Sequence, residues 1–405
     1  MSSVPFSIDA RDGTARAGVL HLTHGRVRTP AFVPLASNGS VRGLGAAEVA
    51  DLGFEMVLGN TFHLFIEPGH EHVAAMGGLH EFMGWPRSII TDSGGFQVFS
   101  MGHGSVAEEI KRRRGGSASR ILSIEEEGVG FRSYADGSKR FMGPETSMEV
   151  QGALGSDIAL AFDECTPFHA DRDYTARSME RTHRWLDRCV AWHGAHGPEG
   201  QALFGIVQGG VYEDLRAESA ARVAEAPLEG IAIGGSLGQE KPQMREVVGW
   251  ALRGLPDERP RHLLGIGDVD DILHAVGAGI DLFDCATPTR LARHGTALAA
   301  EPDQRWRLDL TKADVRSSRE PIAEGCPCTA CREHTRGYLH YLARRRELTG
   351  ARLLALHNLT FMAALMQGLR DAIAEGNFGS YRDAVIGGWA PFERFPARPR
   401  GVSRS

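Results

Sequence analysis

Residues 203–235, LFGIVQGGVYEDLRAESAARVAEAPLEGIAIGG, contain the pattern that decides the fold. Two short apolar runs, at 203–209 and 230–235, flank an amphipathic stretch at 212–224. A near-continuous apolar run of this length is typical of a strand that is buried on both faces, as strands of parallel sheets are. The segment therefore predicts a strand, a covering helix and a second strand of the same sheet.

The same pattern recurs along the chain. Eight apolar runs close on a glycine or a polar residue: AFVPLAS (31–37), EMVLGN (55–60), SIITDS (88–93), IALAFDE (158–164), LFGIVQG (203–209), GIAIGG (230–235), HLLGIG (262–267) and DLFDCA (281–286). Helical patterns also occupy 173–194, 240–253 and 268–277. Eight strands that alternate with helices predict an α/β fold, the (β/α)8 TIM barrel, with a doubly wound open sheet as the alternative.

Two segments do not fit a regular barrel. Residues 94–155 are too long for one connection, and they contain a basic loop at 103–119 and an expected hairpin around Asp136-Gly137. The second segment, 287–357, contains three clustered cysteines. We therefore expect a barrel at 1–286, an inserted zinc-binding subdomain at 287–357, a closing helix region at 358–390 and a disordered tail at 391–405. Asn358 or Thr360 is the expected N-cap of the closing helix.

Composition narrows the class of protein. The chain has 405 residues, 42% of them apolar, and a net charge of -6. No run of eighteen apolar residues occurs, and the start, MSSVPFSIDARDG, does not resemble a secretion signal. Six cysteines are too few for a disulfide scaffold. We expect a cytoplasmic protein that does not contact a membrane. The negative charge argues against nonspecific coating of nucleic acid, but local basic patches still permit RNA binding.

The cysteines have the spacing of a metal site. Cys326, Cys328 and Cys331 lie within six residues, and His357 follows beyond an expected helix. Three thiolates and one imidazole suit a tetrahedral zinc ion, and four protein ligands leave no open position for a substrate. The prediction is one structural zinc. An iron–sulfur cluster is the chemical alternative, although it would more usually use a fourth thiolate.

Three carboxylates follow or end expected strands: Asp92 in TDSGGFQ, Asp163 in AFDECTP and Asp284 in LFDCATPTR. Gln208 and the pair Gly234-Gly235 stand at two further strand ends. Each aspartate alone is equally well explained by a structural role, but the carboxyl ends of barrel strands converge on one mouth. No His-x-His follows the first strand and no G-x-G-x-x-G follows any strand. The pattern favours carboxylates that act as nucleophile and general acid/base in glycosyl transfer.

At these residues the sequence resembles the queuine/guanine tRNA-ribosyltransferases, the tRNA-guanine transglycosylase family, of bacterial type. The matching segments run in order over nearly the whole chain: TPAFVPLAS, VLGNTFHL, IITDSGGFQVFS, AFDECTP, FGIVQGGVY, IAIGG, LLGIGDVDD, GIDLFDCATPTRLARHG, CPCTAC and LLALHNLTF. The fold of that family is a TIM barrel with an inserted zinc subdomain, which agrees with the expectation from the strand pattern.

The resemblance implies exchange of the wobble guanine in tRNAs with a GUN anticodon, those for aspartate, asparagine, histidine and tyrosine. The entering base would be 7-aminomethyl-7-deazaguanine (preQ1), with queuine as the alternative. Asp284 would be the nucleophile on ribose C1′, and Asp92 the general acid/base. A homodimer is also implied. The competing hypotheses are a non-catalytic tRNA-binding paralogue, which should lack the nucleophile, and an unrelated barrel hydrolase with a structural zinc.

The resemblance also implies which residues surround the substrate. Base-binding positions are Asp92, Ser93, Gly94, Gly95, Phe96, Asp163, Gln208, Gly234, Gly235 and Ile266. RNA-binding positions are Gly265, Ile266, Gly267, Asp268, Val269, Asp270, Asp271, Thr289, Arg290, Leu291, Ala292 and Arg293. The basic loop at 103–119 is longer than in the compact bacterial members of the family. It is interpreted either as an extra RNA contact or as a disordered insertion. The segment SLGQEKPQM (236–244) also departs from the form typical of the preQ1 users, which keeps queuine as the alternative entering base.

Overall fold

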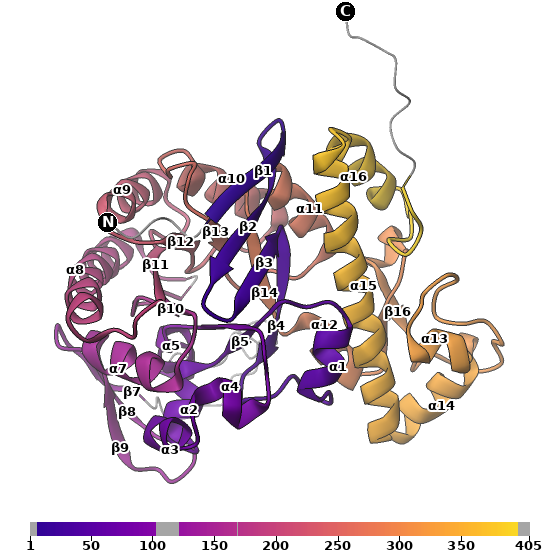
Figure 1. The fold of residues 1–405 in the computed structure, drawn as a ribbon, viewed down its shortest axis with the longest axis horizontal. Coiled ribbons are helices and arrows are strands. Elements are labelled where there is room, and N and C mark those ends of the chain that lie inside the picture. Colours follow the sequence, from indigo (N-terminus) through magenta and orange to yellow (C-terminus); the bar gives the residue numbers. More distant parts are fainter. Residues whose placement is uncertain (1–5, 103–120, 168, 396–405) are drawn as a thin grey trace, which may run out of the picture.

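The computed structural model describes residues 6–102, 121–167 and 169–395; the basic loop at 103–119 and residues 396–405 of the expected tail lie outside this part. Its centre is a closed barrel of parallel strands surrounded by helices (Figure 1). The barrel strands are β4 (Ala31–Ala36), β5 (Met56–Gly59), β6 (Ser88–Thr91), β10 (Ile158–Leu160), β11 (Ala202–Val207), β12 (Gly230–Ile233), β13 (Arg261–Leu263) and β14 (Leu282–Cys285).

Every barrel strand falls on one of the eight apolar runs, so the prediction of a (β/α)8 barrel is confirmed. The strands follow one another in chain order, and β14 pairs with β4 to close the barrel. The register of this closing pair sets Asp284 beside Val33. A doubly wound sheet would leave two open edges, so that alternative is wrong.

Side chains on the barrel strands divide into two layers. One layer fills the barrel interior and includes Val33, Ile90, Phe204 and Leu282. The other faces the surrounding helices and includes Val57. Because successive residues of a strand point to opposite faces, strands that are buried on both faces need apolar residues throughout. This requirement explains the continuous apolar runs in the sequence.

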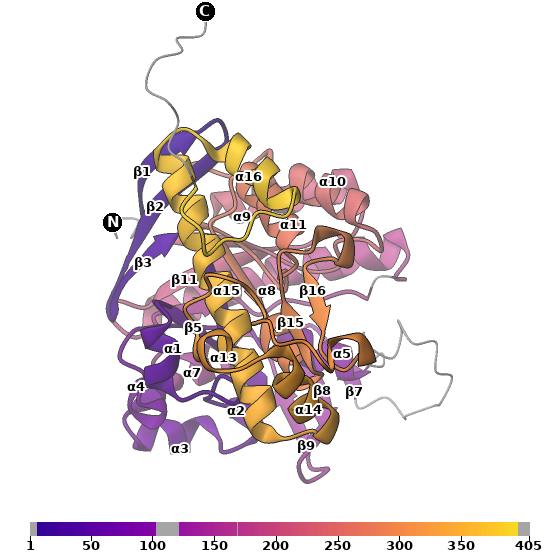
Figure 2. The same cartoon turned by 90° about the vertical axis from the view of Figure 1, so that its right-hand side faces the viewer.

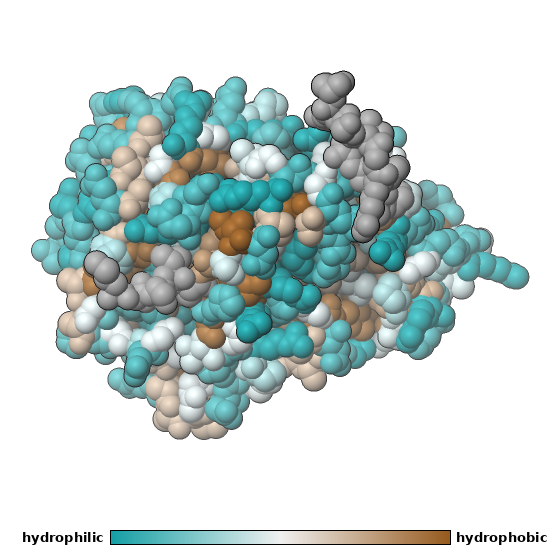
Figure 3. Space-filling model, turned by 45° about the horizontal axis from the view of Figure 1, so that its top comes forward, coloured by the Kyte–Doolittle hydropathy of each residue, from teal (hydrophilic) through white to brown (hydrophobic). Residues whose placement is uncertain are grey.

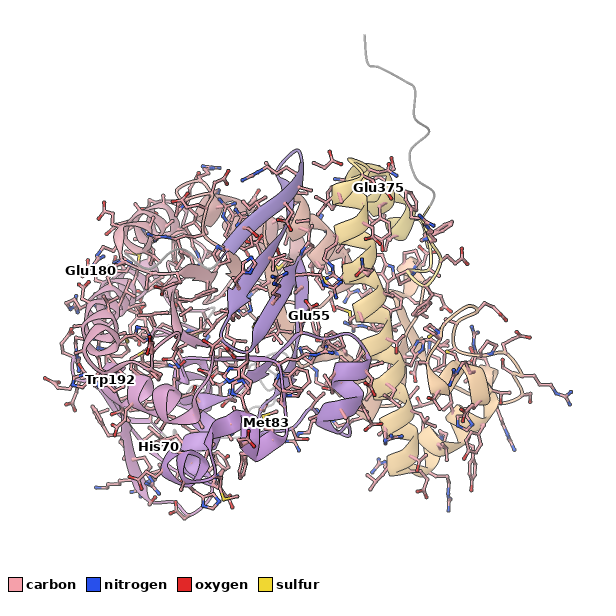
Figure 4. The ribbon with its side chains drawn as sticks, in the orientation of Figure 1. Glu55, His70, Met83, Glu180, Trp192 and Glu375 are labelled. Carbon is pink, nitrogen blue, oxygen red and sulfur yellow. The ribbon has the colours of Figure 1, made fainter. Side chains whose placement is uncertain are left out.

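The helices cover the outside of the barrel. The predicted helical patterns at 173–194, 212–224, 240–253 and 268–277 are confirmed as α8, α9, α10 and α11. Figure 4 shows Glu180 and Trp192 of α8 along the outer edge of the molecule. The helices up to the subdomain are α1 (Ala46–Asp51), α2 (Thr61–Ile66), α3 (His70–Ala75), α4 (Gly78–Met83), α5 (Gly95–Gly102), α7 (Pro144–Leu154), α8 (Arg172–His196), α9 (Glu213–Glu225), α10 (Lys241–Leu252) and α11 (Val269–Gly277).

Besides the two-stranded sheet of the later segment, the described residues form two three-stranded antiparallel sheets outside the barrel. The first, β1 (Phe6–Asp12), β2 (Ala15–Leu22) and β3 (Gly25–Thr29), packs Leu20 and Val27 onto the interior layer and so covers the end at which the strands begin. The second consists of β7 (Ile121–Ile124), β8 (Val129–Arg132) and β9 (Lys139–Met142). Its β8–β9 hairpin turns at Asp136-Gly137, as predicted.

The segment after β14 forms a unit at one side of the barrel (Figure 1), and this unit faces the viewer in Figure 2. The long helix α15 of this segment packs against α13 and α14 and also against β4 of the barrel, and it places His357 opposite the cysteines. The elements after the barrel are α12 (Thr287–Arg293), β15 (Thr296–Leu298), β16 (Arg307–Asp309), the short 3-10 helices Pro302–Gln304 and Ala313–Val315, α13 (Thr329–Glu333), α14 (Arg336–Arg345), α15 (Leu348–Ala374) and α16 (Phe378–Ile386).

The predicted start of the closing helix is wrong. Helix α15 begins at Leu348, so Asn358 and Thr360 lie inside it rather than at its N-terminus. Asn358 is fully buried, and its side chain bonds distant backbone instead of capping a helix. Its Nδ2 donates to Pro288 O (2.9 Å) and Thr296 O (3.1 Å), and its Oδ1 accepts from Leu298 N (2.7 Å).

Helix α15 is also the one helix in the described residues that is long and apolar enough to cross a membrane. Within its most apolar window, 61% is buried inside the molecule, as expected for a core helix. Figure 3 shows a face on which hydrophobic residues are scattered among predominantly hydrophilic ones. The apolar character of α15 is therefore explained by its packing against the barrel.

The Asn358 bonds make a prediction about stability. Replacing Asn358 by alanine leaves the buried N–H of Leu298 without its acceptor. We expect Asn358→Ala to lower the free energy of unfolding by about 1–3 kcal/mol in urea titrations. The exposed Thr349, on the same helix, provides a matched control, and Thr349→Ala should change stability by less than about 0.5 kcal/mol. Equal effects of the two substitutions would contradict this account.

Candidate active site and metal centre

Three aspartates from different strands line one cavity at the carboxyl ends of the barrel. Asp92 follows β6, Asp163 follows β10 and Asp284 lies in β14. The cavity has a volume of about 350 Å³. Four other predicted base-binding residues line it: Ser93, Phe96, Gly234 and Gly235. Residues separated by long stretches of sequence are thus brought together, as the barrel pattern predicted.

Asp92 sits against the N-terminus of α2. Its Oδ1 accepts from Thr61 N (2.8 Å), and its Oδ2 accepts a short hydrogen bond from Asn60 Nδ2. Burial raises the pKa of Asp92 to about 7, and the negative charges of Asp284 and Asp163 add to this effect, while hydrogen bonds from backbone N–H groups oppose it. The carboxyl group can therefore give up or accept a proton near neutral pH.

Asp163 is held by two side chains from neighbouring strands. Ser93 Oγ donates to Oδ1 (2.7 Å), and Gln208 Nε2 donates to Oδ2 (2.6 Å). Burial raises the pKa of Asp163 to about 6, and these two hydrogen bonds oppose the rise. At neutral pH this carboxylate is a fixed, buried acceptor in the wall of the cavity.

Glycine is required at Gly235 for a steric reason. Its φ of +74° lies in the left-handed region, and a Cβ there would lie 2.1 Å from Gln208 Oε1. Gly95 is similar, since its Cβ would lie 2.4 Å from the carbonyl oxygen of Asp163. Both glycines allow the backbone to approach the residues that form the cavity wall.

The polar contacts of Asp284 with the described residues are made by one carboxylate oxygen, Oδ1. Oδ1 accepts from Gly265 N at 3.2 Å, and His262 Nε2 lies 2.9 Å from the same oxygen. Phe96, half exposed at 50%, lies at the open side of the cavity. Gly94, Gly95, Gln208 and Ile266 do not belong to the described residues that line the cavity, and Gln208 acts on it through Asp163.

The cysteines and His357 form a compact cluster in the subdomain. The Sγ atoms of Cys326, Cys328 and Cys331 lie 3.5, 3.5 and 3.3 Å from His357 Nδ1. Metal–sulfur and metal–nitrogen bonds of about 2.3 and 2.0 Å in a tetrahedron require a separation of roughly 3.5 Å between ligand atoms. The Nε2 of His357 lies 2.7 Å from Leu298 O, which leaves Nδ1 free as a ligand. The residues therefore fit one metal ion.

Comparison with known proteins identifies the family. The family model described as Queuine tRNA-ribosyltransferase matches residues 11–391. The chain belongs to this family. A protein of that name from Roseiflexus sp. (strain RS-1) is 48% identical over 398 residues, which cover 95% of this chain and 100% of that protein. The one from Pelotomaculum thermopropionicum is 44% identical over 387 residues, with 95% and 98% covered.

A third relative, the Queuine tRNA-ribosyltransferase of Synechococcus sp. (strain CC9311), is 46% identical over 365 residues and covers 90% of this chain and 92% of that protein. Membership of the queuine tRNA-ribosyltransferase family makes the chain an enzyme of the pentosyltransferase class. The hypothesis of an unrelated barrel hydrolase is therefore wrong.

The two predicted RNA-binding stretches differ in their surroundings. In Gly265–Asp271 the acidic side chains are paired within the protein. Lys241 Nζ lies 3.5, 2.5 and 3.0 Å from carboxylate oxygens of Asp268, Asp270 and Asp271, and Arg307 and Arg245 add further cations beside Asp268 and Asp270. In Thr289–Arg293 the exposed cations are Arg290 and Arg293. Burial lowers the pKa of Arg293, and the nearby charges of Arg42 and Arg290 lower it further. The guanidinium groups of Arg42, Arg290 and Arg293 therefore lie near one another.

Sequence reasoning missed several residues that shape the site. The missed residues are Asn60, Arg42, His262 and, on α9, Arg216. The Arg216 side chain is fully buried and donates to the carbonyl oxygens of Val207, Gly210, Gly234 and Ser236 at 2.8–3.0 Å. These acceptors lie on either side of Gln208 and Gly235. The signal for Arg216 was an arginine on the expected helix 212–224, but nothing in the sequence shows that it points inward.

The surroundings of Asp92 predict a measurable titration. With 13C-labelled aspartate carboxyl groups, NMR should show one carboxyl titrating near pH 7, and this signal should be missing in Asp92→Asn. The pKa of Asp92 in the folded protein lies above its unfolded value of 3.8, so the folded state holds this proton more tightly. The contribution of Asp92 to the free energy of unfolding is therefore greatest below pH 3.8 and is lost as pH rises towards 7. A titration of Asp92 near pH 4 would contradict the expected effect of burial.

Proposed function

We propose that the chain exchanges the wobble guanine of GUN-anticodon tRNAs for preQ1 by double displacement, a step of queuosine biosynthesis. The observation that carries the proposal is the cavity lined by Asp92, Asp163 and Asp284 in a chain of this family. Its volume of about 350 Å³ lies near the lower limit of small-molecule pockets, which suits a single base. A flipped-out guanine would occupy it, because enzymes that act on a base remove it from the stack.

Asp163 is the proposed recognition group for guanine. Its carboxylate, fixed by Ser93 and Gln208, would accept hydrogen bonds from the N1–H and N2–H groups of guanine. Phe96, exposed at the cavity edge, would stack on the base. One set of groups serves both half-reactions, because the entering base uses the space that guanine has left.

Asp284 and Asp92 divide the chemistry. Asp284 would attack ribose C1′ and form a covalent intermediate, while Asp92 gives its proton to the departing guanine. The raised pKa of Asp92 supports this role, since a protonated carboxyl is available near neutral pH. Both aspartates are present, which argues against a non-catalytic paralogue. Arg290 and Arg293, with Arg42 beside them, are the proposed cations for RNA phosphates.

Zinc is the proposed metal, held by Cys326, Cys328, Cys331 and His357. When bound, it would supply structural cross-linking and no chemistry on the base, because all four ligands come from the protein. We also propose a cytoplasmic homodimer. The exposed Tyr338, Tyr341 and Leu348 of the subdomain, at 44%, 57% and 85% exposure, support a protein-binding surface there.

The proposal is tested with labelled guanine and an unmodified GUN-anticodon tRNA. We expect guanine to be incorporated, and omission of the entering base should leave a covalent protein–RNA adduct on denaturing gels. Asp284→Asn should abolish the adduct, because the amide is not a nucleophile for C1′. The absence of incorporation by folded wild-type protein would overturn the function, and an adduct in Asp284→Asn would move the nucleophile elsewhere.

The same assay separates the entering bases. Displacement of labelled guanine by preQ1 with a larger kcat/KM than by queuine is the expected result. The reverse order would assign direct use of queuine.

Metal loss should affect structure rather than chemistry. We expect about one zinc per chain by elemental analysis, and loss of the metal in Cys328→Ala with a lower Tm and weaker tRNA binding. The matched control is Cys189→Ala, which removes a buried thiol outside the cluster. A Cys328→Ala variant with full metal content would contradict the ligand assignment.

A further inference from the structure

His262 is a polar side chain in an apolar layer. In β13 it pairs with Ala232 of β12 and with Leu282 of β14, both of which belong to the barrel interior. Paired residues of parallel strands point to the same face, so the imidazole also points inward. It is fully buried. Burying an imidazole among aliphatic side chains is costly without a polar partner, so its presence needs an explanation.

The polar neighbour of this ring is the proposed nucleophile. Asp284 lies two residues after Leu282 in β14 and therefore on the same face of the strand. Its Oδ1 is 2.9 Å from His262 Nε2. Within the described residues, neither ring nitrogen makes an aligned hydrogen bond. The contact with Oδ1 is therefore close but out of line with the ring N–H. Catalytic hydrogen bonds are often poorly aligned before the substrate binds and shorten or align in the complex.

The two oxygens of Asp284 have different surroundings. Oδ1 receives the N–H of Gly265 at 3.2 Å as well as the His262 contact. No hydrogen bond to Oδ2 is formed by the part of the chain that the structure describes. A carboxylate oxygen that accepts no hydrogen bond is the better nucleophile, whereas the donors suit an oxygen that remains a carbonyl.

We propose that His262 is a positioning residue that holds Asp284 Oδ1, so that Oδ2 is the oxygen that attacks ribose C1′. The inference rests on the proposed function and deepens it. As the Oδ2–C1′ bond forms, the C1′–N9 bond breaks, its electron pair passes to guanine, and the proton of Asp92 is transferred to the departing base. Oδ1 becomes the ester carbonyl oxygen, keeps the N–H of Gly265 and gains an aligned N–H from His262.

The second half-reaction uses the same donors. N9 of the entering base attacks C1′ and its proton passes to Asp92, while the Oδ2–C1′ electron pair returns to the carboxylate of Asp284. Charge then redevelops on the carboxyl group, and an N–H aimed at Oδ1 stabilises it, as donors in an oxyanion hole do. An imidazole has this Nε2–H in its Nε2 tautomer and when protonated.

The test compares substitutions that keep or remove the donor. His262→Gln offers an amide N–H, whereas His262→Leu and His262→Phe fill the space without one. We expect the two apolar variants to slow single-turnover adduct formation by about 10- to 100-fold. We expect His262→Gln to recover most of the rate. The tRNA Kd and the Tm should stay close to wild type in all three, because the ring touches neither the RNA surface nor the zinc cluster.

The outcomes separate this inference from the function on which it rests. No adduct in the wild type would overturn the proposed function. A wild-type adduct with equally fast formation in His262→Leu or His262→Phe would overturn the role of His262 alone. The role also fails if His262→Gln folds but forms the adduct as slowly as the apolar variants. If only His262→Gln folds, His262 is a purely structural residue and the role fails as well.

Discussion

The hydrogen bonds to Asp163 connect neighbouring strand ends at the mouth of the barrel. Ser93 follows β6, Asp163 follows β10 and Gln208 follows β11, and these three strands are neighbours in the barrel. A carboxylate buried in this position must have donors, since an unpaired buried charge is strongly destabilising. Gln208 in turn excludes any side chain at Gly235, which extends the constraint to the end of β12. One buried charge thus fixes four adjacent strand ends.

The three carboxylates in the cavity have different hydrogen-bond partners and therefore different properties. Asp163 is fixed as an acceptor by side-chain donors, and Asp92 is buried at the α2 N-terminus with its pKa raised to about 7. Among the described residues, Asp284 has its backbone and imidazole neighbours on one oxygen only. Carboxyl groups with different partners can serve different purposes in one site. The proposed division of roles therefore rests on the partners of each group rather than on its residue type.

The sequence was informative where the cause is local. Strands that are buried on both faces need continuous apolar runs, so the barrel and its strand ends could be located, and three thiols within six residues indicate a metal. The misses depend on partners far along the chain. Asn358 has the residue type of a helix cap, but its acceptors and donor are at Pro288, Thr296 and Leu298. His262 and Arg216 look like ordinary strand and helix residues until the fold sets them beside Asp284 and the cavity wall.

The Cys326/Cys328/Cys331/His357 cluster and the proposed nucleophile are connected through adjacent residues of α15. His357 presents Nδ1 to the cysteines and Nε2 to Leu298 O, while Asn358 accepts from the N–H of Leu298 and donates to Pro288 O. Pro288 belongs to α12, which begins directly after the strand that carries Asp284. Because hydrogen bonds to a rigid helix restrict the segment on which they act, a metal that fixes α15 also fixes α12 and its arginines. A closed metal site can in this way orient the proposed RNA-binding side of the mouth without contacting the substrate.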